Sequence, residues 1–247
     1  MNNPMMALRT LLVVLVVCLT TGCASVGKNP QDPFEDYNRT MFDFNDKVDS
    51  AILKPVATAY AHVTPGFVQT GVGNFFGNIN DVPTALNDFL QARPADGASD
   101  LARVVFNSTF GIAGMIDVAT PAGLAKHDQD FGQTLGRWGV GSGPYLILPF
   151  IGPTTTRDAL AMPLDFEMDP WGRLYPVALR NIGSAIRVVD HRAYMLGTST
   201  LIDEAALDRY EFVRDAYLQR RQSKIYKGAN KAAPTEEPGN SEDANLN

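Results

Sequence analysis

Cysteine and histidine side chains, which commonly act as nucleophiles, general bases or metal ligands, are few in this chain and stand apart from one another. They are Cys18, Cys23, His62, His127 and His191. A hydrolase needs a nucleophile with a base and an orienting acid, or a metal cluster. The nearest approach to such a set is His127 with Asp128 and Asp130, and neighbours on one loop are usually just solvated. We therefore expect no catalytic residue, no metal site and no cofactor.

Cys23 offers a different chemistry, the acylation of its thiol. The apolar run 11–19 has the length of a signal-peptide core, whereas a spanning helix needs about 20 apolar residues. The small residues Thr21 and Gly22 suit a peptidase that cuts before a lipid-modified cysteine, although Thr20 stands where leucine is usual. The sequence predicts a lipoprotein signal over residues 1–22, with an ordinary secretory signal as the alternative.

Composition limits what the mature chain can bind. Removal of residues 1–22 would leave Cys23 as the only cysteine, so no internal disulfide could form. The formal net charge is −6 and there is no basic stripe, which argues against nucleic acid and against a helix held to anionic lipid by charge. Membrane contact would have to come from acyl chains and apolar surface. Ala24, where retained inner-membrane lipoproteins often carry Asp, favours the outer membrane.

Residues typical of helix starts and ends occur through most of the chain. Asp32-Pro33 predicts a capped helix start, and an apolar stripe at helical spacing follows, either facing the core or facing lipid. Thr64-Pro65-Gly66 marks a break before the next helix, and Asp81-Val82-Pro83 predicts the start of another short one. The stripe consists of Phe34, Tyr37, Met41, Phe44, Val48 and Ile52.

The segment from Val104 to Ala125 is different in kind, because Asp117 is its only charged residue. It is as apolar as a membrane segment, but it is too interrupted to be one spanning helix. We expect an apolar helical hairpin or loop that dips into a membrane or packs against the domain. A hairpin in hydrocarbon would have to lean on the rest of the protein to satisfy its backbone.

Glycine dominates the stretch after Phe131. Gly139, Gly141 and Gly143 alternate, which fits neither a dinucleotide fingerprint nor the Gly-x-Ser-x-Gly nucleophile elbow. Such a run allows close backbone approach, and an extended apolar stretch from Tyr145 to Leu148 follows it. Further on, Thr154–Thr156 can cap a helix, and Ile202 to Tyr217 reads as one face of an amphipathic helix.

A set of motifs in a fixed order gives the chain a specific resemblance. It resembles the MlaA (VacJ) family of outer-membrane lipoproteins from about Asp32 to Tyr226. The motifs are Asp32-Pro33-Phe34-Glu35, Asn38-Arg39-Thr40-Met41-Phe42, Phe44-Asn45, Asn74-Phe75-Phe76, Asn78, Pro83, Asn87, Phe89-Leu90-Gln91, Asn107-Ser108-Thr109, Gly111, Gly114, Asp117, Phe131-Gly132-Gln133-Thr134-Leu135-Gly136, Trp138-Gly139-Val140-Gly141-Ser142-Gly143-Pro144-Tyr145 and Leu148-Pro149.

The resemblance implies an all-α, ring-like domain in the inner leaflet of the outer membrane, with an amphipathic channel through its middle. Misplaced phospholipid would leave the outer leaflet through this channel and pass to a periplasmic MlaC-like carrier. Trimeric porins would be membrane partners. The expected organisation is a signal peptide over 1–22, a linker over 23–31, the helical domain over 32–227 and a disordered tail over 228–247.

Roles for individual residues follow from the same resemblance. The segment 111–124 corresponds to the family's hairpin, expected to gate the channel through Gly111, Gly114, Asp117, Pro121 and Gly123. Phe44 and Asn45 would contact this hairpin, although Asn45 could equally be a satisfied core amide. The channel-adjacent loop would comprise Trp138, Gly139, Gly141, Gly143 and Tyr145, with tight-turn glycines as the alternative reading.

Two arginines are candidates for contact with a lipid phosphate. Arg137 and Arg157 are the basic residues between Asp130 and Asp165, and a guanidinium matches phosphate bidentately. Ion pairing with Asp158 or Asp165 is the competing expectation.

Two other functions compete with transport. A membrane-anchored lipid hydrolase lacks an evident catalytic set, and a structural envelope lipoprotein would need no charge-poor hairpin.

Overall fold

Helices make up most of the computed structural model, which describes residues 32–226. The elements are α2 (Glu35–Val48), the π-helix η1 (Asp49–Leu53), α3 (Lys54–Val63), α4 (Gly66–Leu90), α5 (Pro94–Phe110), α6 (Phe131–Arg137), β1 (Tyr145–Leu148), β2 (Gly152–Thr155), α7 (Thr156–Met168), the 3₁₀ helix η2 (Pro170–Arg173), α8 (Val177–Tyr194), α9 (Leu196–Ala205) and α10 (Arg209–Tyr226). The predicted signal peptide, Cys23, the linker and the tail beyond 227 lie outside the described residues.

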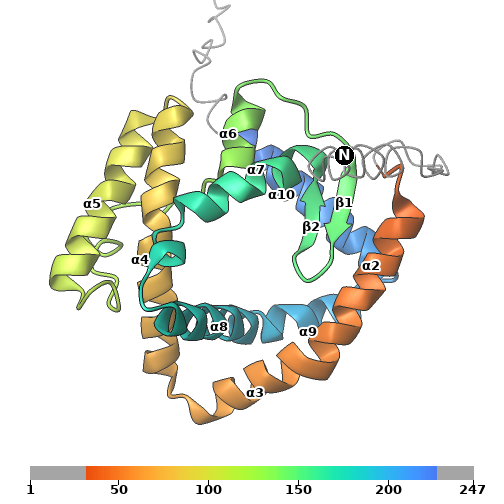
Figure 1. The fold of residues 1–247 in the computed structure, drawn as a ribbon, viewed down its shortest axis with the longest axis horizontal. Coiled ribbons are helices and arrows are strands. Elements are labelled where there is room, and N and C mark those ends of the chain that lie inside the picture. The colour runs from red at the N-terminus through yellow and green to blue at the C-terminus, as the bar shows by residue number, and fades with distance from the viewer. Residues whose placement is uncertain (1–31, 227–247) are drawn as a thin grey trace, which may run out of the picture.

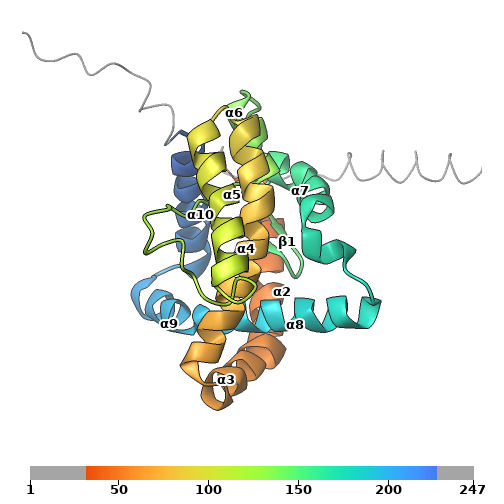
Figure 2. The same ribbon diagram turned by 90° about the vertical axis from the view of Figure 1, so that its left-hand side faces the viewer.

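The elements close into a ring (Figure 1). In chain order α2, η1 and α3 form one side, α3 packs on α8, and α8 packs on η2. From η2 the circuit returns through α7, β2 and β1 to α2. Helix α5 lies outside this circuit against α4, as the turned view shows (Figure 2). The all-α class expected from the sequence is confirmed, with one small sheet.

That sheet is a two-stranded antiparallel hairpin. β1 pairs with β2 in the register Tyr145 to Thr155 and Leu148 to Gly152. The extended apolar stretch predicted at 145–148 is therefore a strand, and Tyr145 and Ile147 on its buried face belong to the core with Tyr210.

Several helix boundaries follow from capping side chains. Asp130 accepts the Gln133 N–H at the start of α6, and Thr155 accepts the Asp158 N–H at the start of α7, as expected for side-chain N-caps. The prediction that Asp32 caps the first helix is wrong. Phe34 is the N-cap residue, while Asp32 is buried and accepts from the Asn38 amide and the Tyr210 hydroxyl.

Two other boundary predictions are wrong. Pro83 does not start a helix, because α4 continues through it from Gly66 to Leu90. Asp81, just before it, is fully buried and pairs with Arg103, so tertiary contacts hold this stretch helical. The amphipathic face read from Ile202 to Tyr217 spans two helices, since α9 ends at Ala205 and α10 begins at Arg209.

The distribution of side chains is inverted relative to a water-soluble domain. Among the described residues, polar and charged side chains outnumber apolar ones in the buried set, whereas many large apolar side chains are exposed. The stripe on α2 follows this pattern, with Tyr37 45% and Ile52 63% exposed. The alternative of a core-facing stripe therefore fails for most of its length. Exposed apolar surface on this scale marks contact with lipid or protein.

Within residues 32–226, every helix is too short or too polar to cross a bilayer.

Candidate functional site: the ring opening and the 111–124 segment

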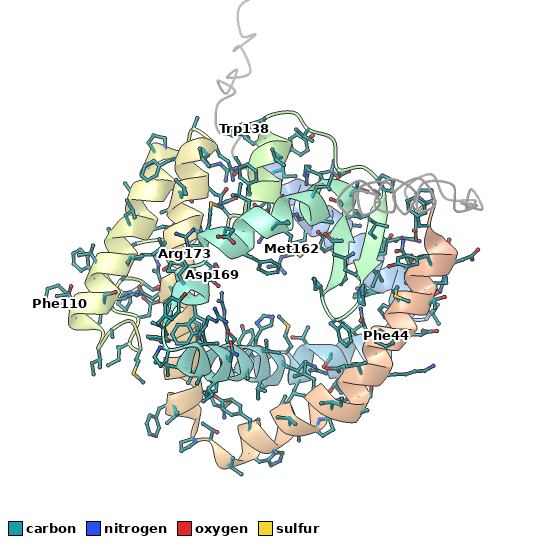
Figure 3. The ribbon with its side chains drawn as sticks, viewed as in Figure 1. Phe44, Phe110, Trp138, Met162, Asp169 and Arg173 are labelled. Carbon is teal, nitrogen blue, oxygen red and sulfur yellow. The ribbon has the colours of Figure 1, made fainter. Side chains whose placement is uncertain are left out.

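The centre of the ring is the first candidate site. In the view with side chains, Met162 on α7 lies above the opening, Phe44 on α2 lies to its right and Asp169 lies to its left (Figure 3). Thioether and aromatic groups thus share the border of the opening with a carboxylate. An opening lined in this way is amphipathic, which suits a molecule with both apolar and charged parts.

The carboxylate at the rim is held by an ion pair. Asp169 Oδ2 lies 2.6 Å from Arg187 Nη1 on α8, and Asp169 Oδ1 accepts the Trp171 N–H at 3.0 Å. Arg187 also lies over the Phe76 ring, 5.6 Å from its centroid. Both partners are about one-third exposed or less, with 33% for Arg187 and 26% for Asp169. A guanidinium so placed can exchange its carboxylate partner for a phosphate.

Two cavities adjoin the ring wall. One of about 260 Å³ lies between α2, the β-hairpin, α9 and α10, and its lining mixes Asn45, Asp49 and Arg209 with apolar side chains. The other, of about 490 Å³, lies between α4, α7 and η2 and is mainly apolar, with Glu167 and Arg173 in its lining. A groove of apolar side chains with one acid and one base suits an acyl chain and a zwitterionic head group.

The 111–124 segment is irregular, not helical. It consists of turns that connect the end of α5 to the stretch before α6. Of the segment 104–125 expected as an apolar helical hairpin or loop, the part up to Phe110 is the end of α5 and the rest is a loop. Exposed apolar side chains cover its first turns, namely Ile112, Met115 and Ile116.

Arg103 anchors the base of this segment. Its side chain is 1% exposed and donates to Asp117 at 3.0 Å, to Thr120 at 2.9 Å and to the Leu124 carbonyl at 2.8 Å. It also contacts Asp81 of α4 at 3.3 Å. A buried guanidinium with this many acceptors fixes the loop to α4 and α5.

Asn107 supplies a second anchor. Its side-chain oxygen accepts the Val118 and Ala119 N–H groups at 2.9 and 3.0 Å, and its amide donates to Asp117 at 3.2 Å. Burial alone would raise the pKa of Asp117, but hydrogen bonds from Thr120 and the Arg103 guanidinium outweigh it and hold that pKa well below its usual range. Asp117 is therefore an anchoring carboxylate that stays charged.

The turn at the start of the segment is conformationally strained. Ile112 and Ala113 have φ values of 52° and 54°, and Gly114 has 91°. Left-handed backbone at a β-branched residue is rare and costs about 1–3 kcal/mol. Glycine is required at 111, where a Cβ would lie 2.0 Å from the Ile116 carbonyl oxygen. Stored strain of this kind clusters at moving or binding elements.

Phe44 and Asn45 contact a different hairpin from the one expected. Asn45 donates to the Leu148 carbonyl at 2.9 Å and accepts the Phe150 N–H at 2.7 Å, and the Phe44 ring packs edge-on against Phe150. Both residues therefore hold the β1–β2 turn, and the expected contact with 111–124 is not what the structure shows. Helix α2 and the 111–124 segment lie on opposite sides of the ring (Figure 1).

The glycine-rich loop does not set the opening. Trp138 lies at the outer edge of the molecule (Figure 3), where its indole N–H donates to the Leu90 carbonyl at 2.9 Å. A Cβ added at Gly139 or Gly141 would meet nothing within 4 Å, so close packing does not require glycine at either position, although Gly139 has a φ of 94°. Gly143 does face Thr156 closely. Tyr145 is fully buried in the core.

The two candidate arginines differ in position. Arg157 is buried, donates to Asp158 at 2.9 Å and reaches the Val140 carbonyl at 3.3 Å. This is the ion pairing left open by the sequence, and burial keeps Arg157 from a membrane phosphate. Arg137 ends α6 and is partly exposed.

The remaining predicted gate residues lie along the 111–124 turns. Pro121 and Gly123 are exposed, and Gly114 packs so closely on Asn78 that a Cβ would lie 2.7 Å from its amide nitrogen.

Sequence reasoning missed the residues that matter most to this geometry. Asp117 was singled out as a lone charge, and a lone charge in an apolar segment requires a counter-charge. Arg103, immediately before that segment, was the available signal. Asp169 and Arg187 carry no local pattern that would join them, because they come from different elements.

The comparisons with known proteins agree on one family. A family model described as MlaA lipoprotein matches residues 30–224. The chain is 37% identical over 228 residues to the intermembrane phospholipid transport system lipoprotein MlaA of Shigella flexneri, covering 87% of this chain and 88% of that protein. The Haemophilus influenzae protein of the same name is 31% identical over 235 residues, covering 90% and 93%.

A solved structure shares the fold. It comes from work on the structural basis for maintenance of bacterial outer membrane lipid asymmetry. The match has a TM-score of 0.68 at 36% identity and covers 78% of this chain and 98% of that chain.

Proposed function

Since the chain belongs to the MlaA lipoprotein family, we propose that it removes phospholipids from the outer leaflet of the outer membrane and passes them through the ring opening to a periplasmic carrier. This activity maintains the lipid asymmetry of that membrane. The names of its relatives, as lipoproteins of an intermembrane phospholipid transport system, support this assignment.

The observation that carries the proposal is the combination of an inverted surface and an amphipathic opening. Apolar side chains face outward along α5, where Phe110 is 68% exposed, while Asp169 and Arg187 place charge at the rim of the opening. Outward apolar faces suit a body embedded in one leaflet. The charged rim would let a head group pass while acyl chains follow the apolar groove between α4 and α7.

Position and partners belong to the same proposal. The domain lies in the inner leaflet, faces the periplasm and is tethered through acylated Cys23. A trimeric porin and a soluble MlaC-like carrier are its protein partners. We infer that the 111–124 segment acts as a mobile gate, and the strained turn at Ile112 supports a second conformation there.

Lipid crosslinking tests the route. A photo-reactive amino acid at Met162 or Asp169 in cells should yield phospholipid adducts, whereas the same group at Arg220, a charged position that is 70% exposed, should yield fewer. Equal labelling at all three positions would remove the opening from the pathway.

A genetic test addresses the activity. Deletion of the gene should raise outer-leaflet phospholipid and detergent sensitivity, and the Asp169→Ala chain should restore both less well than the wild-type chain. Unchanged outer-leaflet lipid in the deletion strain would reject the function.

A further inference from the structure

Three side chains with metal-binding chemistry meet at one end of the α4–α5 pair. They are Asp88 on α4, Asp100 on α5 and His127 in the stretch before α6, and one ligand atom from each lies within 4.8 Å of the others. His127 Nδ1 lies 3.0 Å from Asp100 Oδ2. Ligands about 2.1 Å from a common ion stand about 3 Å apart, so this separation already fits, and a small movement of Asp88 completes the set.

Asp88 is the observation that points to a ligand. It is fully buried, and within residues 32–226 neither of its carboxylate oxygens has a hydrogen-bond partner. Arg93 Nη1 is 3.9 Å from Asp88 Oδ1, beyond hydrogen-bond reach. A buried carboxylate that receives no hydrogen bond is costly unless a closer cation or a proton meets it.

The other two side chains are oriented by their surroundings. Asp100 Oδ1 accepts the His127 backbone N–H at 3.3 Å, which leaves Oδ2 directed at the imidazole. On the far side of the ring, His127 Nε2 lies 3.6 Å from Asp96 Oδ1. A carboxylate behind a histidine is the usual outer partner of a metal-binding imidazole, because it fixes the ring and raises its basicity.

We propose that Asp88, Asp100 and His127 bind a divalent transition-metal cation, with Asp96 orienting the histidine. One imidazole nitrogen with two carboxylates suits Zn²⁺ or Mn²⁺ better than Mg²⁺ or Ca²⁺, which take oxygen ligands alone. The cation would join α4, α5 and the stretch that leaves the 111–124 segment. Its role is structural, since it fixes where that segment ends.

The sequence could not reveal this set. His127 was grouped with Asp128 and Asp130 by proximity along the chain. In the structure Asp128 instead forms an ion pair with Lys224, and Asp130 with Arg221. The rival explanation is a proton shared between the carboxyl groups of Asp88 and Asp100, without any metal.

Metal titration distinguishes a bound cation from a shared proton. The full-length lipoprotein is purified in detergent without a histidine tag and stripped of metal with a chelator. Calorimetry with ZnCl₂ and MnCl₂ should show one saturable equivalent with a Kd below about 10 μM for at least one of them, and elemental analysis should recover it after desalting. Absence of saturable binding for both ions would overturn the proposal in favour of the shared proton.

Variants make the test specific. Asp88→Asn retains the shape of a protonated acid, so the fold should survive while affinity falls about a hundredfold, and His127→Gln should behave alike. Asp96→Asn should weaken binding about tenfold. His62→Gln, an exposed histidine on α3, should bind like wild type. Wild-type affinity in both Asp88→Asn and His127→Gln would overturn the site, and this readout does not depend on lipid transport.

Discussion

The side-chain oxygen of Asn45 accepts the backbone N–H of Phe150 at 2.7 Å. Asn38, two helical turns earlier on the same face of α2, accepts the Ile147 N–H at 2.8 Å and donates to the Tyr145 carbonyl at 3.0 Å. The free edge of β1 is therefore satisfied by two asparagines of a helix where other sheets would add a strand. The hairpin side of the ring depends on these amides.

Replacing the asparagines should loosen this edge unequally. Asn38→Ala leaves a fully buried strand edge unpaired and should lower the free energy of unfolding by about 2–4 kcal/mol, whereas Asn45→Ala should cost about 1–2 kcal/mol. Chemical unfolding measures the loss, and amide exchange at Ile147 and Phe150 locates it. Asn181→Ala, an exposed asparagine of α8, is the control. Equal small losses in all three variants would contradict the role given to the amides.

Arg103→Lys should release the 111–124 segment. A single ammonium cannot reach Asp81, Asp117, Thr120 and the Leu124 carbonyl together, so we expect a loss of about 2–4 kcal/mol. Hydrogen exchange should accelerate across 111–124 more than in α2. Arg220→Lys, whose side chain is 70% exposed, should change neither quantity. Unaltered exchange in Arg103→Lys would show that the segment is held by something else.

Glycine substitutions distinguish packed from open positions. Gly114→Ala combines a φ of 91° with a Cβ 2.7 Å from the Asn78 amide nitrogen and should cost about 2 kcal/mol or more. Gly141→Ala meets nothing within 4 Å and should stay within about 0.5 kcal/mol of wild type. Thermal unfolding in detergent compares them. A large loss for Gly141→Ala would restore the tight glycine loop that the sequence suggested.

Asp165 should give stability a distinct pH dependence. Burial, partly offset by the Phe131 N–H bond and reinforced by Asp130, raises the pKa of Asp165 to about 6. Because the folded-state pKa exceeds the unfolded one, this carboxyl stabilises the fold at low pH, and its contribution disappears as the pH rises through about 6.

Comparison with Asp165→Asn isolates that contribution. Wild type should gain about 1 kcal/mol or more over the variant as the pH falls from about 7 to about 5. Denaturant unfolding at several pH values measures it, with Asp43→Asn on the exposed face of α2 as the control. A difference that does not change with pH would contradict the raised pKa.

Sequence reasoning succeeded where the information was local. Helix punctuation at Thr64-Pro65-Gly66, the cap at Thr155 and the strand at 145–148 all depend on neighbouring residues, and each is confirmed. The order of the motifs was sufficient to identify the family and the all-α fold class.

Failures came where distant residues decide the outcome. Pro83 reads as a helix start, yet the burial of Asp81 against Arg103 keeps α4 continuous. Asn45 was correctly seen as a polar residue on an apolar stretch, but its partner is about a hundred residues away along the chain. Spacing along a chain cannot show which of two hairpins a helix will meet.

The outward apolar side chains have a consequence for the journey that the proposed location requires. A chain carrying Phe67 at 79% and Leu160 at 77% exposure would aggregate in the aqueous space between two membranes. A carrier that shields only the acyl chains proposed for Cys23 would leave this surface exposed to water. We therefore expect a chaperone to bind the domain itself during transit. The apolar surface would first be stably covered by lipid when the domain reaches the outer membrane.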